Sequence, residues 1–242
     1  MTPSRNRQPL LILLLAGVMM LGMVVWSWPA TRWQGVNYHV QQQHMPLGLK
    51  LVAFLHRDAE YRHLVSTLVP SRADRDATIL QLFEWTRAHI RPVPEGFPIV
   101  DDHVWDIIVR GYGTQDQAAD VFATLCAYAG IPAQLQFLRI SGRAAAFGVA
   151  LVQCSHGWGV FEPQHHIIIR SADGSVASLA QVHADPTLIA RCVPNQMFAG
   201  YPLARYFETL PSGLDAGFSK PDQQMPWRRL RMVPSRWGGN VR

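Results

Sequence analysis

Hydrophobic residues recur at helical spacing within residues 111–133, whose sequence is GYGTQDQAADVFATLCAYAGIPA. Four of them would share one face of a helix: Phe122, Leu125, Cys126 and Ala129. Asp116 would complement the positive end of that helix, while Gly130 and Pro132 supply a left-handed cap and a stop. The pattern therefore predicts a glycine-rich turn, a buried helix and then a strand.

Periodicity on either side of this unit predicts further helices and strands. Upstream, a helix or a broken pair of helices is expected over residues 49–68, and a stronger helix over 74–90 with Ser71 or Asp74 as its cap. Short runs rich in β-forming residues predict strands at 134–140, 146–154 and 158–163, with 165–170 and 175–179 as further candidates. A helix followed by an antiparallel meander is typical of an α+β fold.

Residues 9–28 carry no charge, and about twenty apolar residues in a helix suffice to span a bilayer. Arg5 and Arg7 precede them, which predicts a cytoplasmic N-terminus and export of the remainder. A cleaved signal peptide is the alternative, but a cut after Ala30 would put Trp28 where a small residue is needed. We therefore expect a single-pass membrane protein with most of the chain exported; the family resemblance described below implies a bacterial inner membrane and the periplasm.

The expected organisation has five parts. They are a cytoplasmic N-terminus (1–8), a transmembrane signal anchor (9–28), a juxtamembrane linker with helices (29–73), a core (74–183) and a partly irregular C-terminal extension (184–242). The net charge of +5 owes much to WRRLRMVPSRW near the C-terminus. No nucleic-acid-binding motif accompanies that cluster, so a solvated tail, or contact with anionic lipid or an acidic partner, is expected instead of nucleic acid.

The turn Gly111-Tyr112-Gly113 and the phrase Gly130-Ile131-Pro132-Ala133 resemble the core of the transglutaminase-like superfamily. The resemblance covers roughly residues 74–163 and implies a papain-like core, in which a buried helix packs on an antiparallel sheet. It also implies thiol acyl transfer by a cysteine at the helix start, a histidine on the next strand and an acid on the strand after that.

The positions implied for these three residues hold other chemistry. Gln115 stands at the nucleophile position, Phe147 at the histidine position, and Glu162 at a position where the family has aspartate followed by proline. An amide is no nucleophile and a phenyl ring accepts no proton. The resemblance therefore implies a pseudoenzyme with no catalytic residues.

Other cysteines and histidines leave alternatives open. Cys154 and His156 could form a dyad in an active thiol protease or acyl transferase, or Cys154 could form a disulfide with Cys192. Cys126 lies on the apolar helix face and is expected to be a buried hydrophobe. His165 and His166 would point to opposite faces of a strand, so we expect no metal site and no cofactor.

A fold that has lost its chemistry can still offer a groove for binding. The candidate residues of that groove are Trp105, Tyr112, Gly113, Gln115, Asp116 and Trp158. Aromatic and amide groups together suit a polysaccharide or an extended peptide. We therefore expect a binding or scaffold component of an envelope system, such as exopolysaccharide synthesis or export, with a protein partner; the alternative is a structural subunit of a membrane protein complex.

Overall fold

The structure is a computed structural model that describes residues 7–71, 74–101, 103–214 and 219–237 of the 242-residue chain. The helices are α1 (Arg7–Ser27), α2 (Leu47–Leu68), α3 (Arg75–His89), α4 (Val104–Arg110), α5 (Gln115–Tyr128), α6 (Leu179–Ala184), α7 (Thr187–Cys192), α8 (Leu203–Phe207), the 3-10 helix η1 (Pro221–Gln224) and α9 (Pro226–Trp237). The longer strands are β1 (Pro29–Val36), β2 (His39–Pro46), β6 (Ala133–Arg139), β7 (Ala146–Cys154) and β8 (Gly157–Glu162). The two-residue strands are β3 (Arg91–Pro92), β4 (Val100–Asp101), β5 (Tyr112–Gly113), β9 (Ile167–Ile168), β10 (Met197–Phe198) and β11 (Tyr201–Pro202).

Helix α5 is the predicted buried helix, and its local sequence explains both of its ends. Thr114 and Gln117 form a capping box, which satisfies backbone N–H groups that the first turn leaves without partners. After the last turn, Gly130 has a φ of +84°, as the predicted left-handed cap requires. Every residue from Gln117 to Tyr128 is buried, so the helix is enclosed on all sides.

Strands β6, β7, β8 and β9 form one antiparallel sheet in sequence order, which confirms the predicted meander and the α+β class. Because side chains alternate along a strand, β7 contributes to two separate cores. Ala150, Val152 and Cys154 face α5, whereas Phe147, Val149 and Leu151 belong to the core on the opposite face. The predicted strand at 175–179 is instead a loop with two isolated bridges, Arg170 to Val176 and Gly159 to Ser178, and Leu179 already begins α6.

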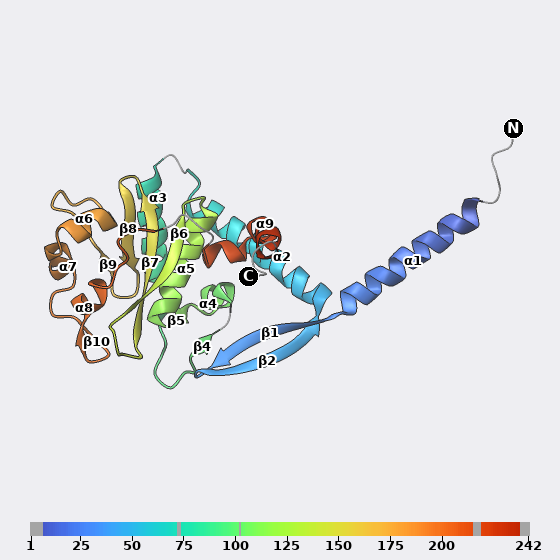
Figure 1. The fold of residues 1–242 in the computed structure, drawn as a ribbon, viewed down its shortest axis with the longest axis horizontal. Helices are drawn as coiled ribbons and strands as arrows, with labels where there is room; N and C mark the ends of the chain where they lie inside the picture. The colour runs from blue at the N-terminus through green and yellow to red at the C-terminus, as the bar shows by residue number, and fades with distance from the viewer. Residues whose placement is uncertain (1–6, 72–73, 102, 215–218, 238–242) are drawn as a thin grey trace.

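Helices cover both faces of the sheet (Figure 1). Residues of α2, α3, α4 and α5 fill the core on one face, and residues of α6, α7 and α8 fill the core on the other. The prediction of helices over 49–68 and 74–90 is confirmed, and the side chain of Asp74 accepts hydrogen bonds from the N–H groups of Asp76 and Ala77. These layers hold the start of α5 against the first residues of β7.

Residues 29–46, the first part of the segment predicted as a juxtamembrane linker with helices, form a β-hairpin. Strands β1 and β2 pair along their full length, from Pro29 with Pro46 to Val36 with His39. Asn37 and Tyr38 form the turn with φ values of 47° and 66°, the left-handed pair typical of a tight hairpin. The tip pairs with β4 through Gly35 and Val36, so the hairpin reaches the body of the protein at a distance from its base.

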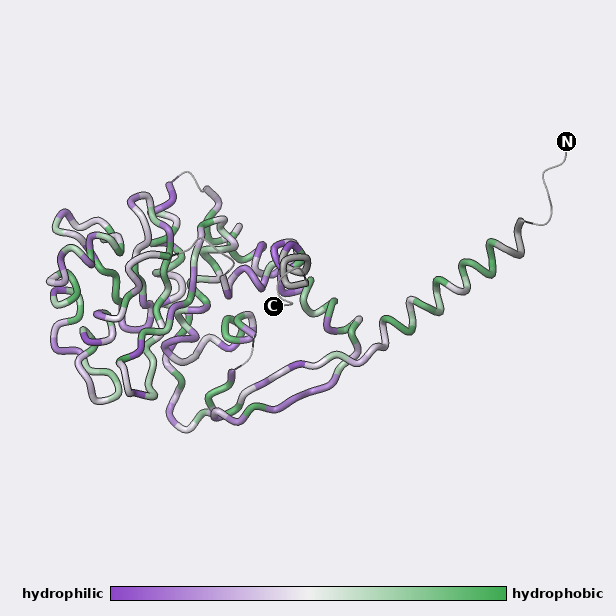
Figure 2. Tube along the Cα trace, in the orientation of Figure 1, coloured by the Kyte–Doolittle hydropathy of each residue, from purple (hydrophilic) through white to green (hydrophobic). Residues whose placement is uncertain are grey.

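Helix α1 is mainly hydrophobic and precedes the hairpin (Figure 2). Side chains are described from Leu11 onward, and residues 11–27 extend about 25 Å, against the roughly 30 Å of a bilayer's hydrocarbon core. Within the described residues, no helix combines the length and the apolar character needed to cross a membrane. This finding contradicts the predicted transmembrane anchor at 9–28 and the predicted single-pass location in a bacterial inner membrane. Arg5 lies outside the described residues.

The C-terminal segment returns to α5, where an irregular tail was expected in part. The Nζ of Lys220 lies 2.6 Å from the buried carboxylate of Asp120, and the hydroxyl of Tyr128 donates to the carbonyl of Gln224 at 2.9 Å. Helix α9 follows, and the guanidinium of Arg229 lies over the ring of Phe54 on α2. The described part of the extension is therefore packed onto the fold.

Candidate functional site

A cavity of about 660 Å3 lies at the N-terminal end of α5. Separate segments of the chain line it: the hairpin tip, the loop into β4, the first turn of α5, the start of β7 and one residue of β10. Its lining residues are Gly35, Tyr38, Val40, Ile99, Asp101, Thr114, Gln115, Asp116, Gln117, Ala145, Ala146 and Phe198. Of the predicted groove residues, Gln115 and Asp116 line it.

The turn before α5 is fixed by backbone pairing. Strand β5, which includes Gly113, runs parallel to β3, and Gly111 has a φ of +71°. The carbonyl of Gly113 accepts a hydrogen bond from Nε2 of Gln164 at 3.2 Å, which joins the turn to the chain after β8. A Cβ at Gly113 would come within 2.8 Å of the Gln117 amide that completes the capping box. A glycine here therefore keeps the helix start intact.

Gln115, at the position implied for the nucleophile, is bound to strand β7 through its side chain. Its Oε1 accepts from the backbone N–H of Gly148 at 3.1 Å, and its Nε2 donates to the Gly148 carbonyl. Gly148 lies on β7 just before the stretch paired with β8, which begins at Ala150. The carboxamide therefore satisfies the N–H and the carbonyl of Gly148, a residue with which β8 does not pair.

Gly148, and not Phe147, is the β7 residue that faces the start of α5. A Cβ at Gly148 would come within 2.7 Å of the Asp116 Cβ and 2.9 Å of its Cα. Phe147 points to the opposite face of the sheet, where its ring meets Phe198 edge-on at 5.0 Å. Phe147, the position that the resemblance implies for a histidine, therefore lies on the face of the sheet away from the start of α5, because adjacent residues of a strand point to opposite faces. The residue that does face the helix start leaves no space for an imidazole.

Glu162, at the position implied for the acid, is fully buried and bound to a histidine that follows it. Nδ1 of His165 lies 2.8 Å from its Oε2, and the backbone N–H groups of Gln164 and His165 donate to the same carboxylate. The hydrogen bond to Glu162 raises the pKa of His165, against the lowering effect of burial. His165 packs on the Phe147 ring at 5.9 Å. A histidine–carboxylate pair therefore exists, but the described lining of the cavity contains no histidine.

The aromatic residues predicted for the groove lie elsewhere. Trp105 packs edge-on against Tyr61 of α2, with 5.2 Å between ring centroids. Tyr112 meets Phe97 and the guanidinium of Arg110. Trp158 pairs with Gln153, five residues along β7 from Gly148, which corresponds to about 17 Å of strand. Tyr38 and Phe198 line the cavity instead.

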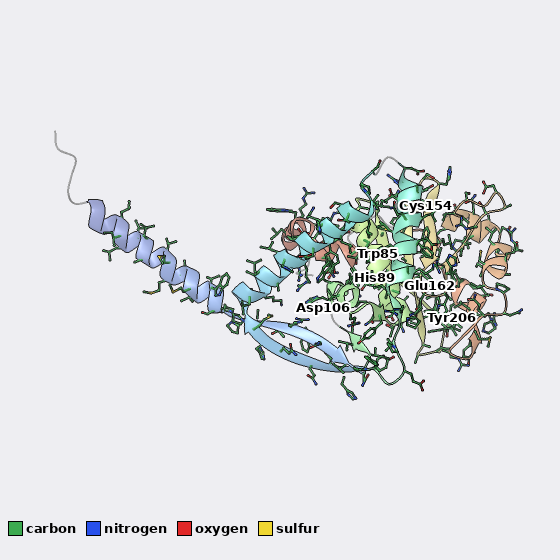
Figure 3. The ribbon with its side chains drawn as sticks, turned by 180° about the vertical axis from the view of Figure 1, so that it is seen from behind. Trp85, His89, Asp106, Cys154, Glu162 and Tyr206 are labelled. Atoms are coloured by element: carbon green, nitrogen blue, oxygen red, sulfur yellow. The ribbon has the colours of Figure 1, made fainter. Side chains whose placement is uncertain are left out.

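The alternative dyad of Cys154 and His156 lacks the environment that thiol chemistry needs. Cys154 is buried in the core, and burial followed by the nearby Asp76 carboxylate raises its pKa to about 12. A nucleophilic cysteine needs the reverse, a thiol whose pKa is lowered. In Figure 3, Cys154 lies at one end of the sheet, and Glu162 lies toward the other. The structure does not support this dyad.

None of the three cysteines forms a disulfide in the described structure. Cys154 and Cys192 are unpaired, so the disulfide considered between them is absent from the described structure. Cys126 is fully buried on α5, as predicted, and burial raises its pKa strongly. Among the described residues, no group of three or more His, Cys, Asp or Glu side chains is arranged to hold a metal ion.

Gly148 and the hairpin tip were not predicted as part of the site. His165 and His166 were expected on a strand, but they lie in the turn between β8 and β9. A glycine inside an otherwise apolar strand is a signal for close approach of another backbone, and it could have identified Gly148. No comparable signal marks Tyr38 or Val40, because the hairpin lacks the usual Asn-Gly turn. Chemically, the cavity offers two carboxylates, Asp101 and Asp116, beside apolar and aromatic walls, without a thiol or an imidazole among its described lining residues.

Comparisons with known proteins add little to this site. No protein-family model matches the chain, and the curated proteins contain no match. Among solved structures, the chain is similar to one described as a putative cysteine protease from Cytophaga hutchinsonii, with 13% identity and a TM-score of 0.39. The match covers 52% of this chain and 45% of that one, so this chain spans less than half of its length. The likeness fits a papain-like or transglutaminase-like fold only loosely, and it carries no inference about activity.

Proposed function

We propose that the protein is a non-catalytic binding domain and that the cavity at the start of α5 holds its ligand. The observation that carries this proposal is the pairing of the Gln115 carboxamide with the backbone of Gly148. Covalent acyl transfer needs a nucleophile with a base in hydrogen-bond reach. Here the position implied for the nucleophile is an amide whose hydrogen-bonding groups are used to join helix and strand. The role proposed is therefore recognition without turnover.

The lining of the cavity favours a ligand with a basic group. Asp116 accepts a hydrogen bond from the Thr114 hydroxyl at 2.7 Å and lies in the first turn of α5, where the helix dipole stabilises its charge. Asp101 adds a second carboxylate, and no lysine, arginine or histidine occurs among the lining residues that the structure describes. A pocket lined by charge of one sign attracts ligands of the opposite sign.

The apolar part of the cavity favours an extended ligand over a compact ion. Tyr38, Val40 and Phe198 form walls beside the carboxylates, and Tyr38 is 84% exposed. A peptide segment with a lysine or arginine would place its cation at the carboxylates and its neighbouring side chains on these walls. The carboxylates and these walls together favour a basic peptide as the proposed ligand. Nothing in the described residues supports a role in exopolysaccharide synthesis or export.

Fluorescence anisotropy with three labelled peptides of equal length, carrying lysine, glutamine or glutamate at the centre, tests the proposal. We expect saturable binding of the lysine peptide and weaker binding of the other two. Asp116→Asn should weaken binding by about tenfold, as loss of a charge-assisted contact implies. Asp173→Asn, on an exposed loop, is the matched control and should leave binding unchanged.

Two results would contradict the proposal. Equal affinity for the three peptides, or no binding of any of them, would show that the carboxylates do not recognise a basic group. Mass spectrometry would detect cleavage of any of these peptides by the purified protein. Cleavage that a thiol reagent inhibits would indicate a thiol enzyme instead. An oligosaccharide that binds and displaces no peptide would also count against a peptide ligand.

A further inference from the structure

A second group of charged side chains lies away from the cavity, where the hairpin meets α2 and α4. Arg32 of β1 donates to the Asp106 carboxylate of α4 at 3.0 Å. Lys50 of α2 donates to the carbonyl of Thr31, next to Arg32, at 2.5 Å. Figure 3 shows Asp106 on α4, on the part of the body nearest the hairpin.

Helical spacing brings two further residues to this group. Arg57 follows Lys50 by seven residues, two turns of α2, and therefore lies on the same face. His103, the residue before α4, precedes Asp106 by one turn. Arg32, Lys50, Arg57, His103 and Asp106 are named the cationic cluster below. It contains three permanent positive charges and one carboxylate.

Arg57 is the unusual member of the cluster. Its side chain is half-buried, and its Nε is inaccessible to solvent and without a hydrogen-bond partner; Nε of Arg32 is in the same state. Arg57 takes part in no ion pair or aromatic contact among the described residues. Removing a guanidinium from water is costly unless an acceptor replaces the water. Asp106, the carboxylate that acts electrostatically on Arg57, is already bound to Arg32.

We propose that the cationic cluster is a binding site for an oxyanion, with Arg57 as its principal donor. A guanidinium presents a planar fork of N–H groups that matches two oxygens of a phosphate or carboxylate group. Arg57 and Lys50 supply the charge that Asp106 does not neutralise. The bound oxyanion would join the hairpin to α2 and α4, and this site does not depend on the peptide cavity.

His103 reports on occupancy of this site. Its pKa is lowered to about 4, first by burial and then by Arg57 and Arg32, with Lys50 adding to the decrease and Asp106 opposing it. A bound oxyanion would offset the positive charges, so the pKa of His103 should rise on binding.

Titration of the full chain with inorganic phosphate, and separately with acetate, tests the proposal by NMR of the histidine rings. His103→Gln assigns the resonance. We expect a saturable shift of His103 with at least one oxyanion, phosphate alone indicating a phosphate group and both indicating any oxyanion. Arg57→Gln should weaken binding by about tenfold or more, and Arg57→Lys, which keeps the charge but loses the fork, by less.

Arg87→Gln is the control, because Arg87 is an exposed arginine on α3 that pairs with Glu84 outside the cluster. It should leave the titration unchanged. In buffer without oxyanions, Arg57→Gln should unfold at the same temperature as the parent protein or higher, since it removes an unpaired charge. Failure of both anions to shift His103, unchanged affinity in Arg57→Gln, or lower stability of Arg57→Gln in anion-free buffer would each overturn the proposal.

Discussion

Gln115 and Gly148 are joined by two hydrogen bonds: the side-chain amide of Gln115 donates to the Gly148 carbonyl, and its oxygen accepts from the Gly148 N–H. The helix start is thereby attached to β7 as a neighbouring strand would be. In the resembling family, this position would carry the reacting group. In this protein the same position connects two elements of the core.

Shortening the carboxamide should destabilise the fold. Gln115→Ala leaves the N–H and carbonyl of Gly148 without partners, and we expect a loss of about 1–3 kcal/mol in the free energy of unfolding. Gln115→Glu should be worse at neutral pH, because a carboxylate cannot donate to the Gly148 carbonyl. Urea denaturation measures both. Gln41→Ala, on the exposed strand β2, is the control, and an equal effect there would contradict the proposed attachment.

A methyl group at Gly148 should be poorly tolerated. The added Cβ would come within 2.9 Å of the backbone of Asp116, so either α5 or β7 must move. We expect Gly148→Ala to cost about 1–3 kcal/mol, as overpacking does in other cores. Gly213→Ala meets no atom within 4 Å and serves as the control in the same denaturation experiment. Equal stability of the two variants would show that β7 and α5 lie farther apart at Gly148 than described.

The pair of His165 and Glu162 should stabilise the fold in acid more than in base. Because the folded-state pKa of His165 lies above its ordinary value of 6.5, the contribution is complete below about pH 6.5 and is lost as pH rises through the folded-state pKa. His165 is partly exposed, so we expect less than about 1 kcal/mol. The difference in unfolding free energy between the parent and His165→Gln, measured across pH, should shrink as pH rises. A constant difference would rule out the linkage.

Thiol reagents should react slowly with two of the three cysteines. Cys126 and Cys154 are buried, and the raised pKa of Cys154, about 12, leaves almost no thiolate near neutral pH. In Cys192→Ser, we expect iodoacetamide to label the native protein only as fast as it unfolds, and to label it rapidly in urea. Mass spectrometry of the labelled peptides reports the sites. Rapid native labelling of Cys154 would contradict this prediction and revive a thiol enzyme.

The buried helix and the meander could be predicted because their periodicities are strong. Capping residues at both ends of α5 agree with its apolar pattern, and β7 is an apolar run bounded by polar turns. The hairpin could not be predicted in the same way. Strand β2 is exposed over nearly its whole length and rich in glutamine, so neither alternation nor composition marks it as a strand.

The sequence pointed to the start of α5 as the candidate site, but it could not show which residue of β7 faces that start. Phe147 and Gly148 are adjacent in sequence, and only the pairing register decides which of them faces α5. Sequence periodicity gave no register, because both faces of β7 are buried. The aromatic walls were missed for a different reason: Tyr38 and Phe198 come from segments that approach α5 only through tertiary packing.

Because one wall of the cavity comes from the hairpin tip, the cavity is a composite of residues far apart in the chain. A shortened protein that begins at α2 would keep the central helix and the four-stranded sheet. It would nevertheless lack Tyr38 and Val40. A ligand screen on such a fragment would therefore test a cavity that lacks one of its walls.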